Sequence, residues 1–433
     1  MRIVINGMFW SRQTVGTGQY LHGLLDALPR VAPEHEYIVL LPASPDQRPN
    51  GHDISCPDQR LTSDGHARGA HRQPEKGDPL GASPKPPIFT LDPSFAVRGG
   101  TIYRALTSFV VVRTPFDGQS KNLAKLWFEQ IGVPLAAARL RADLLHVPYF
   151  APPLLASAPV VATILDLIPL LLPEYRGSAA VRAYMRLAVL ATRRAAHVIA
   201  ISEDSRADII THLGIAPARV MTVPLAAGPQ YRPLDREQAA ACVAERYGLR
   251  GPFIYYVGGL DARKNVETLV RAFGRLRRVG GPPATLAIAG RALGADERLF
   301  PDLDALITSE RMAPWVRRLD VPHADNPLLY AAATAFAYPS RYEGFGMPPL
   351  EAMACGTPTV VADTSSLPEV VGGAALRVPP DDVSGWVTAL WRLLGDRVLR
   401  EELRRRGLER AAAFSYERVA RATAEVYRRV IVL

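Results

Sequence analysis

Two glutamates, Glu343 and Glu351, stand with seven residues between them in a segment that combines acidic side chains with glycines and prolines. The segment, 338–358, reads Tyr-Pro-Ser-Arg-Tyr-Glu-Gly-Phe-Gly-Met-Pro-Pro-Leu-Glu-Ala-Met-Ala-Cys-Gly-Thr-Pro. We expect a strand that ends near Tyr338, a glycine loop, and a helix that begins at about Pro348, because a first helical turn tolerates proline. Glu351 would then lie in the first turn of that helix.

Such a segment suits a ligand that carries both phosphate and sugar hydroxyls. The backbone amides of Gly344, Phe345 and Gly346 and of the helix start would face the ligand, since helix N-termini offer free N–H donors and partial positive charge. A carboxylate that accepts from vicinal hydroxyls is a usual way to hold a ribose. Glu343 and Glu351 could therefore bind two different parts of one extended ligand. The alternative is a solvated loop glutamate and an ordinary helix charge.

A second segment, 257–265, adds positive charge in the sequence Val-Gly-Gly-Leu-Asp-Ala-Arg-Lys-Asn. A strand runs into a glycine turn at Gly258 and Gly259, and two adjacent cations, Arg263 and Lys264, follow. Open α/β sheets bind ligands at the carboxyl ends of their strands. Arginine can fork onto phosphate oxygens and lysine adds a point charge, so the pair could neutralise a diphosphate leaving group. A solvated basic helix start is the alternative.

A third segment, Gly16-Thr17-Gly18, lies between the first strand and an expected helix at 21–28. Its small residues would let the backbone approach an acceptor or a phosphate closely. The segment lacks the G-x-G-x-x-G spacing of a dinucleotide fingerprint, and no acidic residue ends the following strand. An ordinary tight turn is an equal alternative, and a nicotinamide-dependent oxidoreductase is disfavoured.

The elements that must position these residues alternate between strand-like and helix-like stretches, which predicts an α/β protein with parallel sheets. We expect two doubly wound domains that face each other across a cleft, with residues 1–228 and 229–415. Residues 42–87 are polar, rich in Pro and Gly, and lack apolar periodicity, so we expect a long mobile insertion there. The clearest strands are predicted at 3–5, 37–41, 144–146, 160–164, 198–201, 253–257, 286–289, 335–338 and 359–361.

Composition bounds the class of protein. The chain has 433 residues and nearly half are apolar, which fits two domains of roughly 200 residues each. Its three cysteines are widely spaced, so we expect no disulfide framework or zinc site and a reducing compartment. The net charge of +9 suits anionic partners in general, but no basic and aromatic interleaving indicates nucleic acid. We expect neither a signal peptide nor a membrane span.

Together these segments resemble the retaining family 4 glycosyltransferases, which have the GT-B fold. The resemblance covers most of the chain and is strongest over 257–380. It implies that Glu351 binds the donor ribose, that Glu343 lies beside the donor sugar and phosphates, and that Arg263 and Lys264 hold the diphosphate. It also implies that the helix 416–433, which follows Phe-Ser-Tyr at 414–416, crosses back onto the first domain.

The resemblance further implies a metal-independent enzyme without a cofactor, in which the second domain binds the donor nucleotide and the first binds the acceptor. A GDP- or UDP-linked hexose would be the donor, with mannose as the first choice. The acceptor would be a carbohydrate, a lipid-linked molecule or a small molecule. We expect a cytoplasmic enzyme. A non-catalytic sugar-nucleotide-binding protein is the main alternative.

Two departures from the family pattern affect the expected site. Leu165 stands where the family often has a histidine, so Asp166 or the nearby His146 could take over part of that role, although a structural histidine is the stronger alternative for His146. Gly259 stands where many members have an arginine. Separately, three arginines at 182, 186 and 193 share one helix face and could contact an anionic membrane or a phosphorylated lipid, unless that face is simply solvated.

Overall fold

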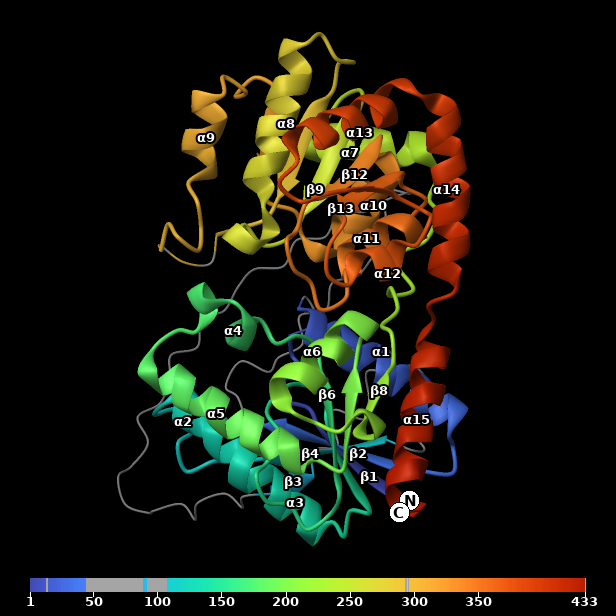
Figure 1. The fold of residues 1–433 in the computed structure, drawn as a ribbon. Coiled ribbons are helices and arrows are strands. Elements are labelled where there is room, and N and C mark those ends of the chain that lie inside the picture. Colours follow the sequence, from blue (N-terminus) through green and yellow to red (C-terminus); the bar gives the residue numbers. More distant parts are fainter. Residues whose placement is uncertain (13–14, 44–88, 92–106, 293, 295, 433) are drawn as a thin grey trace, which may run out of the picture.

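The computed structural model describes residues 1–12, 15–43, 89–91, 107–292, 294 and 296–432. Two α/β domains lie one above the other, and the chain crosses between them twice (Figure 1). The predicted insertion at 42–87 lies outside the described residues, apart from Pro42 and Ala43 at the end of strand β2.

The N-terminal domain is built on an eight-stranded sheet in the order β3-β4-β2-β1-β5-β6-β7-β8. Seven of its strands run parallel, whereas β3, which was not predicted from the sequence, pairs antiparallel with β4 at the edge. An antiparallel edge strand on a parallel sheet is common. The strands are β1 (Arg2–Asn6), β2 (Glu36–Pro42), β3 (Phe89–Leu91), β4 (Thr107–Val112), β5 (Leu144–Val147), β6 (Val160–Ile164), β7 (His197–Ala200) and β8 (Val220–Thr222).

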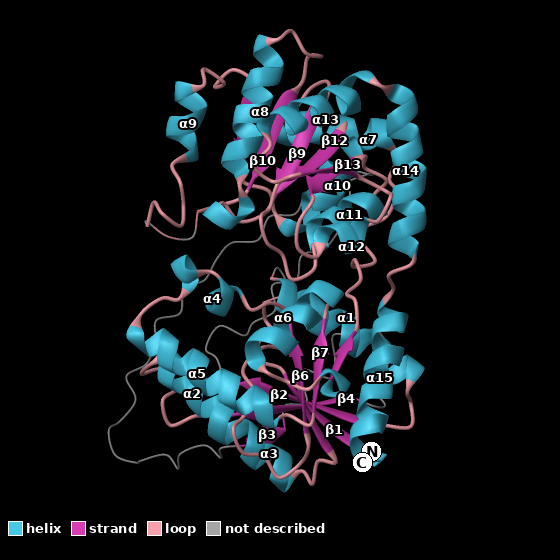
Figure 2. Ribbon diagram, in the orientation of Figure 1, coloured by secondary structure: helices cyan, strands magenta, loops and turns pink. Residues whose placement is uncertain are grey.

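Helices cover both faces of this sheet (Figure 2). Ile3 and Ile5 of β1 belong to one buried apolar cluster and Val4 to another, because successive side chains of a strand point to opposite faces. The helices are α1 (Gly16–Val31), α2 (Lys121–Trp127), a π-helical turn (Phe128–Gly132), α3 (Val133–Arg139), α4 (Ile168–Leu171), α5 (Ala179–Arg194) and α6 (Glu203–Leu213).

The C-terminal domain has six parallel strands in the order β11-β10-β9-β12-β13-β14. They are β9 (Phe253–Val257), β10 (Thr285–Ala289), β11 (Val316–Leu319), β12 (Ala335–Tyr338), β13 (Thr359–Ala362) and β14 (Leu376–Val378). The helices are α7 (Arg236–Tyr247), α8 (Val266–Arg278), α9 (Leu303–Ser309), α10 (Asn326–Ala332), α11 (Met347–Ala354), α12 (Leu367–Val371), α13 (Val383–Gly395), α14 (Arg397–Ala412) and α15 (Tyr416–Val432). The prediction of two doubly wound α/β domains is therefore confirmed.

The last helix, α15, runs from the C-terminal domain down along the N-terminal domain and ends near the N-terminus (Figure 1). Tyr416 begins this helix and lies over Gly23 of α1, where an added Cβ would fall 2.1 Å from the tyrosine ring. The Tyr416 hydroxyl donates to the backbone carbonyl of Gln19. The predicted return of the C-terminal helix onto the first domain is thus confirmed, and a glycine in α1 makes room for it.

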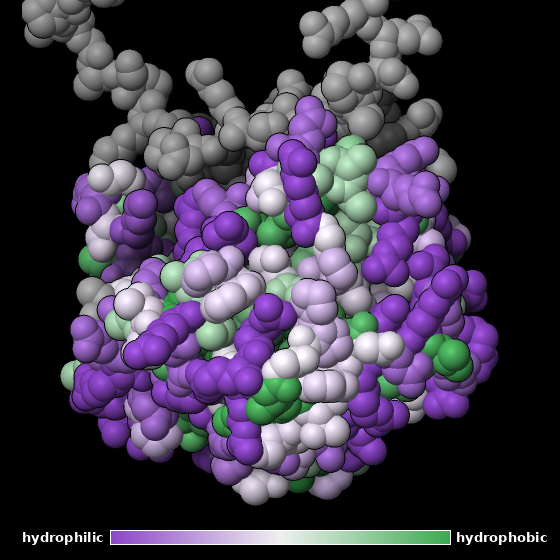
Figure 3. Space-filling model, turned by 90° about the horizontal axis from the view of Figure 1, so that it is seen from above, coloured by the Kyte–Doolittle hydropathy of each residue, from purple (hydrophilic) through white to green (hydrophobic). Residues whose placement is uncertain are grey.

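The outer end of the C-terminal domain is mostly hydrophilic (Figure 3). In this view hydrophobic residues lie singly among polar ones, as is normal for a surface in contact with water. Among the described residues, no helix combines the length and the apolar composition needed to cross a membrane.

Candidate active site

Two loops of the C-terminal domain meet at the point where the order of its sheet reverses. Strands β9 and β12 are neighbours in the sheet and parallel, so their carboxyl ends lie at the same edge. The loop after β9 carries Arg263 and Lys264, and the loop after β12 carries Glu343. A crevice outside such a reversal point is where open α/β sheets bind their ligands.

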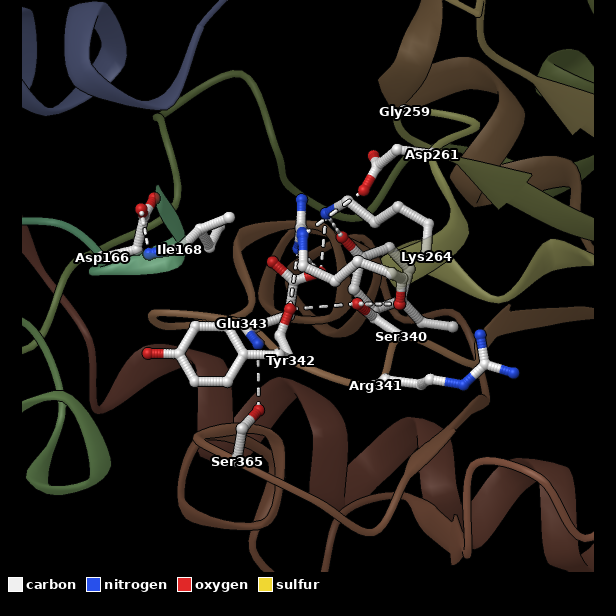
Figure 4. Close-up of polar contacts among 12 residues, drawn as sticks. Asp166, Ile168, Gly259, Asp261, Lys264, Ser340, Arg341, Tyr342, Glu343 and Ser365 are labelled. Carbon is white, nitrogen blue, oxygen red and sulfur yellow. Dashed lines mark hydrogen bonds and ion pairs between the residues drawn. The ribbon is translucent and has the colours of Figure 1, made fainter. Parts of the chain in front are cut away.

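Three charged side chains converge between these loops (Figure 4). Oε1 of Glu343 accepts from Nζ of Lys264 at 2.6 Å and forms an ion pair with Nη1 of Arg263 at 3.1 Å. Lys264 also donates to the Tyr338 hydroxyl at 2.6 Å, and Arg263 donates to the backbone carbonyl of Tyr342 at 2.7 Å. Each of the three charged side chains is nearly buried, with 11–12% of its surface exposed.

Electrostatics keeps the carboxylate of this cluster ionised. Burial alone would raise the pKa of Glu343, but Lys264 and Arg263 outweigh it and lower that pKa to about 2. Burial lowers the pKa of the Lys264 ammonium, and Glu343 offsets part of that effect. The carboxylate of Glu343 thus lies between two basic side chains and forms an ion pair with each.

The cluster keeps capacity for a further anion. Nε of Arg263 is buried and has no hydrogen-bond partner, while the nearest Asp261 oxygen lies 3.4 Å away. The ammonium of Lys264 has three N–H donors, of which Tyr338 and Glu343 take two. Asp261 adds a second carboxylate beside Arg263, so a diphosphate would be drawn by the unpaired N–H donors rather than by an excess of positive charge.

The Glu343 loop touches the N-terminal domain through its glycine. A Cβ added at Gly344 would lie 1.9 Å from the backbone oxygen of Leu165, so a side chain is excluded there. The backbone carbonyl of Gly344 accepts from the hydroxyls of Ser202 and Ser205 at the start of α6, at 2.8 and 2.9 Å. This contact holds the two domains together directly beside the charged cluster.

Asp166 faces the cluster from the N-terminal domain. Its Cβ lies 3.2 Å from the position that a Gly344 Cβ would take, and Oδ1 accepts from the backbone N–H of Ile168 at 3.2 Å (Figure 4). Burial raises the pKa of Asp166, which the Ile168 N–H and Arg263 partly counter. The structure therefore brings Asp166, together with the preceding Leu165, to the contact between the domains.

Among the described residues, Glu351 has hydrogen-bond partners other than those of this cluster. Helix α11 begins at Met347, so Glu351 is its fifth residue, and the prediction that it lies in the first turn was wrong. Its side chain is buried and accepts from the Tyr330 hydroxyl at 3.1 Å. Burial raises the pKa of Glu351 to about 7, although hydrogen bonds from Tyr330 and Tyr231 counter it.

The other glycines of the two loops allow backbone conformations or close contacts that a side chain would hinder. Gly346 has φ of +114°, and Gly258 has φ of +154°, values that favour glycine. Phe345 is buried and packs edge-on against Phe414, with ring centroids 5.8 Å apart. Gly259 lies beside Asp261, whose carboxylate oxygen would be 2.8 Å from an added Cβ.

The N-terminal segment Gly16-Thr17-Gly18 forms the first turn of α1, so the prediction of a loop before a helix at 21–28 was wrong. A Cβ at Gly18 would lie 1.9 Å from the carbonyl oxygen of Arg12. The small size of Gly18 thus lets it pack against the backbone of Arg12, rather than against a ligand. An added Cβ at Gly16 would meet nothing within 4 Å, so that residue leaves open space.

His146 lies inside the N-terminal domain and is fully buried. Nε2 of its ring bonds to the Thr163 hydroxyl at 2.9 Å, and Nδ1 bonds to the Tyr427 hydroxyl of α15 at 2.7 Å. Burial lowers the pKa of His146 to about 3. With both nitrogens occupied, this side chain anchors α15, and the structure corrects its suggested catalytic role.

Three residues at the site, Tyr175, Asp261 and Ser365, escaped prediction from the sequence. The Tyr175 hydroxyl, which comes from the N-terminal domain, donates to Asp261, and Ser365 accepts from the backbone N–H of Glu343 at 3.0 Å. Asp261 could have been found, because it precedes the Arg-Lys pair by two residues. Tyr175 carried no local signal, since its role depends on how the two domains meet.

The chain matches two family models, one over part of the N-terminal domain and one over most of the C-terminal domain. Residues 88–227 match the glycosyltransferase family 4 model, and residues 245–410 match the model of glycosyl transferases group 1. The chain is therefore a member of the family 4 glycosyltransferases, a retaining family with the GT-B fold. This membership sets aside the oxidoreductase alternative.

Individual relatives agree with this assignment. The chain is 35% identical over 271 residues to O-antigen chain mannosyltransferase B of Escherichia coli, which covers 62% of this chain and 70% of that protein. Among solved structures, sucrose-phosphate synthase from Thermosynechococcus elongatus superposes with a TM-score of 0.68 at 18% identity, over 100% of this chain and 99% of that one. Anabaena Alr3699/HepE in complex with UDP-glucose gives a TM-score of 0.66 at 19% identity, over 99% of both chains. These two likenesses concern the fold.

Proposed function

We propose that this glycosyltransferase moves a mannosyl residue from a nucleotide-diphosphate sugar to a hydroxyl group of a polysaccharide, glycolipid or small-molecule acceptor. The observation that carries the proposal is the convergence of Arg263 and Lys264 on Glu343 beside the contact between the domains. The relationship to an O-antigen mannosyltransferase supports mannose as the sugar, and a guanosine donor is the first to test.

The two cations would hold the diphosphate of the donor. Nε of Arg263 and the third N–H of Lys264 supply donors for phosphate oxygens, and the positive charge would stabilise the diphosphate as it leaves. Because these side chains can neutralise the leaving group, we propose that transfer does not depend on a metal ion. The carboxylate of Glu343 would orient both cations and lie beside the sugar.

Retention would follow from a reaction on one face of the sugar. The bond between the anomeric carbon and the diphosphate oxygen breaks, and the acceptor oxygen forms its bond to that carbon from the same side. The acceptor proton passes to the departing phosphate oxygen. Asp166, on the N-terminal side of the domain contact, would orient the acceptor hydroxyl. Glu351 would hold the ribose through a carboxylate that a shift of its tyrosine partners frees.

A transfer assay tests the proposal. The purified chain would be incubated with GDP-mannose, UDP-glucose and UDP-galactose, each with a panel of mannosides, and products followed by mass spectrometry and by NMR of the new anomeric proton. We expect an α-linked mannoside from GDP-mannose, with chelator present. Tight nucleotide binding without turnover of any donor would instead indicate a non-catalytic binding protein. A stable glycosyl-enzyme adduct would overturn the same-face mechanism.

A further inference from the structure

A groove of about 450 Å³ lies on the N-terminal domain between α4 and α5, outside the charged cluster. Its rim carries four exposed arginines, and its floor is apolar, formed by Leu170, Met185, Val189 and neighbouring side chains. Figures 1 and 2 show α5 along the side of this domain, with α4 above it and α2 beside it. The arginines are Arg176, Arg182, Arg186 and Arg193.

The charge around this groove is not balanced locally. The residues that line it include no aspartate or glutamate, and all of them are described. Arg186 has neither a hydrogen bond nor an ion pair with any described residue, whereas Arg182 and Arg193 each donate to one backbone carbonyl and keep other N–H groups free. Arginines held close together repel one another, so an anion that binds between them lowers the free energy of this surface.

The groove also exposes apolar surface beside the charge. Leu190 is 47% exposed, and the neighbouring helix α2 exposes Leu123 and Leu126. Helix α2 packs on α5, since Nζ of Lys125 donates to the Tyr184 hydroxyl at 2.6 Å. Basic and aliphatic side chains therefore share this side of the domain, a combination typical of surfaces that lie at a lipid interface.

We propose that the α4–α5 groove and its arginines dock the enzyme on an anionic lipid bilayer, with lipid phosphates on the guanidinium groups and acyl chains over the apolar floor. Arg182 and Arg193 are eleven residues apart, which is about 16 Å along a helix. That span exceeds one phosphate group, so several headgroups match the row of arginines better than a single soluble ligand does. Charge complementarity selects anionic over neutral lipids.

Segment 166–176 connects this surface to the site of transfer. Asp166 at its start faces the charged cluster, while Pro169 and Arg176 line the groove, and Tyr175 bonds to Asp261 across the domain contact. The same short segment therefore joins the proposed membrane-facing groove to the contact between the domains beside the charged cluster. The proposal concerns where the enzyme sits and does not depend on which sugar it transfers.

Co-sedimentation with vesicles tests the proposal on the full chain. Vesicles of phosphatidylcholine alone are compared with vesicles that also contain phosphatidylglycerol, at low and at high salt. We expect binding to the anionic vesicles, weakened by salt. The double variant Arg182→Gln/Arg186→Gln should lower the partition coefficient about 25-fold, at about fivefold for each arginine near an anionic surface. The variant Leu190→Asp should weaken binding as well.

A matched control separates the groove from net charge. Arg392→Gln/Arg397→Gln removes the same charge from exposed positions on α13 and α14, and it should bind vesicles as the wild type does. Circular dichroism confirms that all variants fold. Equal losses in both double variants, or no binding to anionic vesicles, would overturn the proposal. So would a soluble alkyl phosphate that stabilises the wild type but not Arg182→Gln/Arg186→Gln while both bind vesicles equally, because the groove would then hold a single phosphorylated ligand.

Discussion

Replacing Glu343 by glutamine removes the carboxylate that Lys264 and Arg263 share. The pair lowers the pKa of this group from 4.5 to about 2, a difference worth about 3 kcal/mol of folding free energy at neutral pH. Loss of one partner of a buried ion pair costs about 3–5 kcal/mol in general. We therefore expect Glu343→Gln to lower the free energy of unfolding by about 3 kcal/mol at pH 7.

The pH dependence of that loss follows from the direction of the shift. A carboxylate whose pKa is lower in the folded protein stabilises it above the unfolded pKa of 4.5, and this contribution disappears as pH falls from 4.5 toward 2. Urea unfolding of the wild type and of Glu343→Gln should therefore differ by a constant amount at pH 6 and pH 7. The difference should shrink by pH 3.

Binding and turnover should separate in the same variant. Without the carboxylate, Lys264 loses its ionic partner and Arg263 keeps only Asp261, so a nucleoside diphosphate should bind Glu343→Gln at least as tightly as it binds the wild type. The transfer rate should fall by about 100-fold or more, because the cations are no longer oriented toward the leaving group. Isothermal titration and the transfer assay measure the two effects independently.

The control for Glu343→Gln is Glu402→Gln. Glu402 also accepts from two arginines, Arg405 and Arg406, but it lies on the exposed surface of α14, where ion pairs contribute little. This variant should unfold like the wild type. If Glu343→Gln were equally mild, the description of a buried ion-pair cluster would be refuted.

Three further predictions concern residues around the cluster. Gly344→Ala places a Cβ against the Leu165 carbonyl, so transfer should fall at least about tenfold while titrated nucleotide affinity stays unchanged. Burial raises the pKa of Glu351 to about 7, so its carboxylate destabilises the fold as pH rises from 4.5 through 7. In urea unfolding, the free energy of unfolding of Glu351→Gln minus that of the wild type should therefore increase by about 3 kcal/mol as pH rises from 4 to 9. In the same assay His146→Ala should lower the free energy of unfolding by about 2 kcal/mol, because the buried hydroxyls of Thr163 and Tyr427 lose their hydrogen-bond partner. The folded variant should transfer sugar at nearly the wild-type rate, whereas loss of a catalytic histidine would abolish transfer.

Local pattern predicted most of the strands, and four of the five described strands that it missed lie at the edges of the sheets. The buried strand β6 was predicted with its observed bounds, because five consecutive apolar or β-branched residues leave little ambiguity. Strands β3, β4, β8, β11 and β14 were missed, and of these only β4 lies inside its sheet. Strands β11 and β14 show why an edge strand is hard to recognise. Each is short, carries arginine and lies at an edge, where charged residues protect against pairing with other chains and hide the strand in the sequence.

The site was predictable where it depends on chain order and not where it depends on distant packing. Glycine turns after two strands indicated that Lys264 and Glu343 would meet, although 79 positions separate them. Spacing alone also suggested that Glu351 would join them, but Tyr330 of another helix holds it elsewhere. Local reasoning favoured a structural role for His146, but it could not identify the partner Tyr427, which lies 281 positions away.

The central claim is that Lys264 and Arg263 bind the diphosphate of the donor. Isothermal titration of GDP and UDP into the wild type and Lys264→Met tests it most directly, with Lys121→Met on the exposed surface of α2 as control. We predict that Lys264→Met weakens the preferred nucleotide roughly 10- to 100-fold, as expected for losing a charged hydrogen bond, while Lys121→Met binds normally. Unchanged affinity in Lys264→Met would contradict the account.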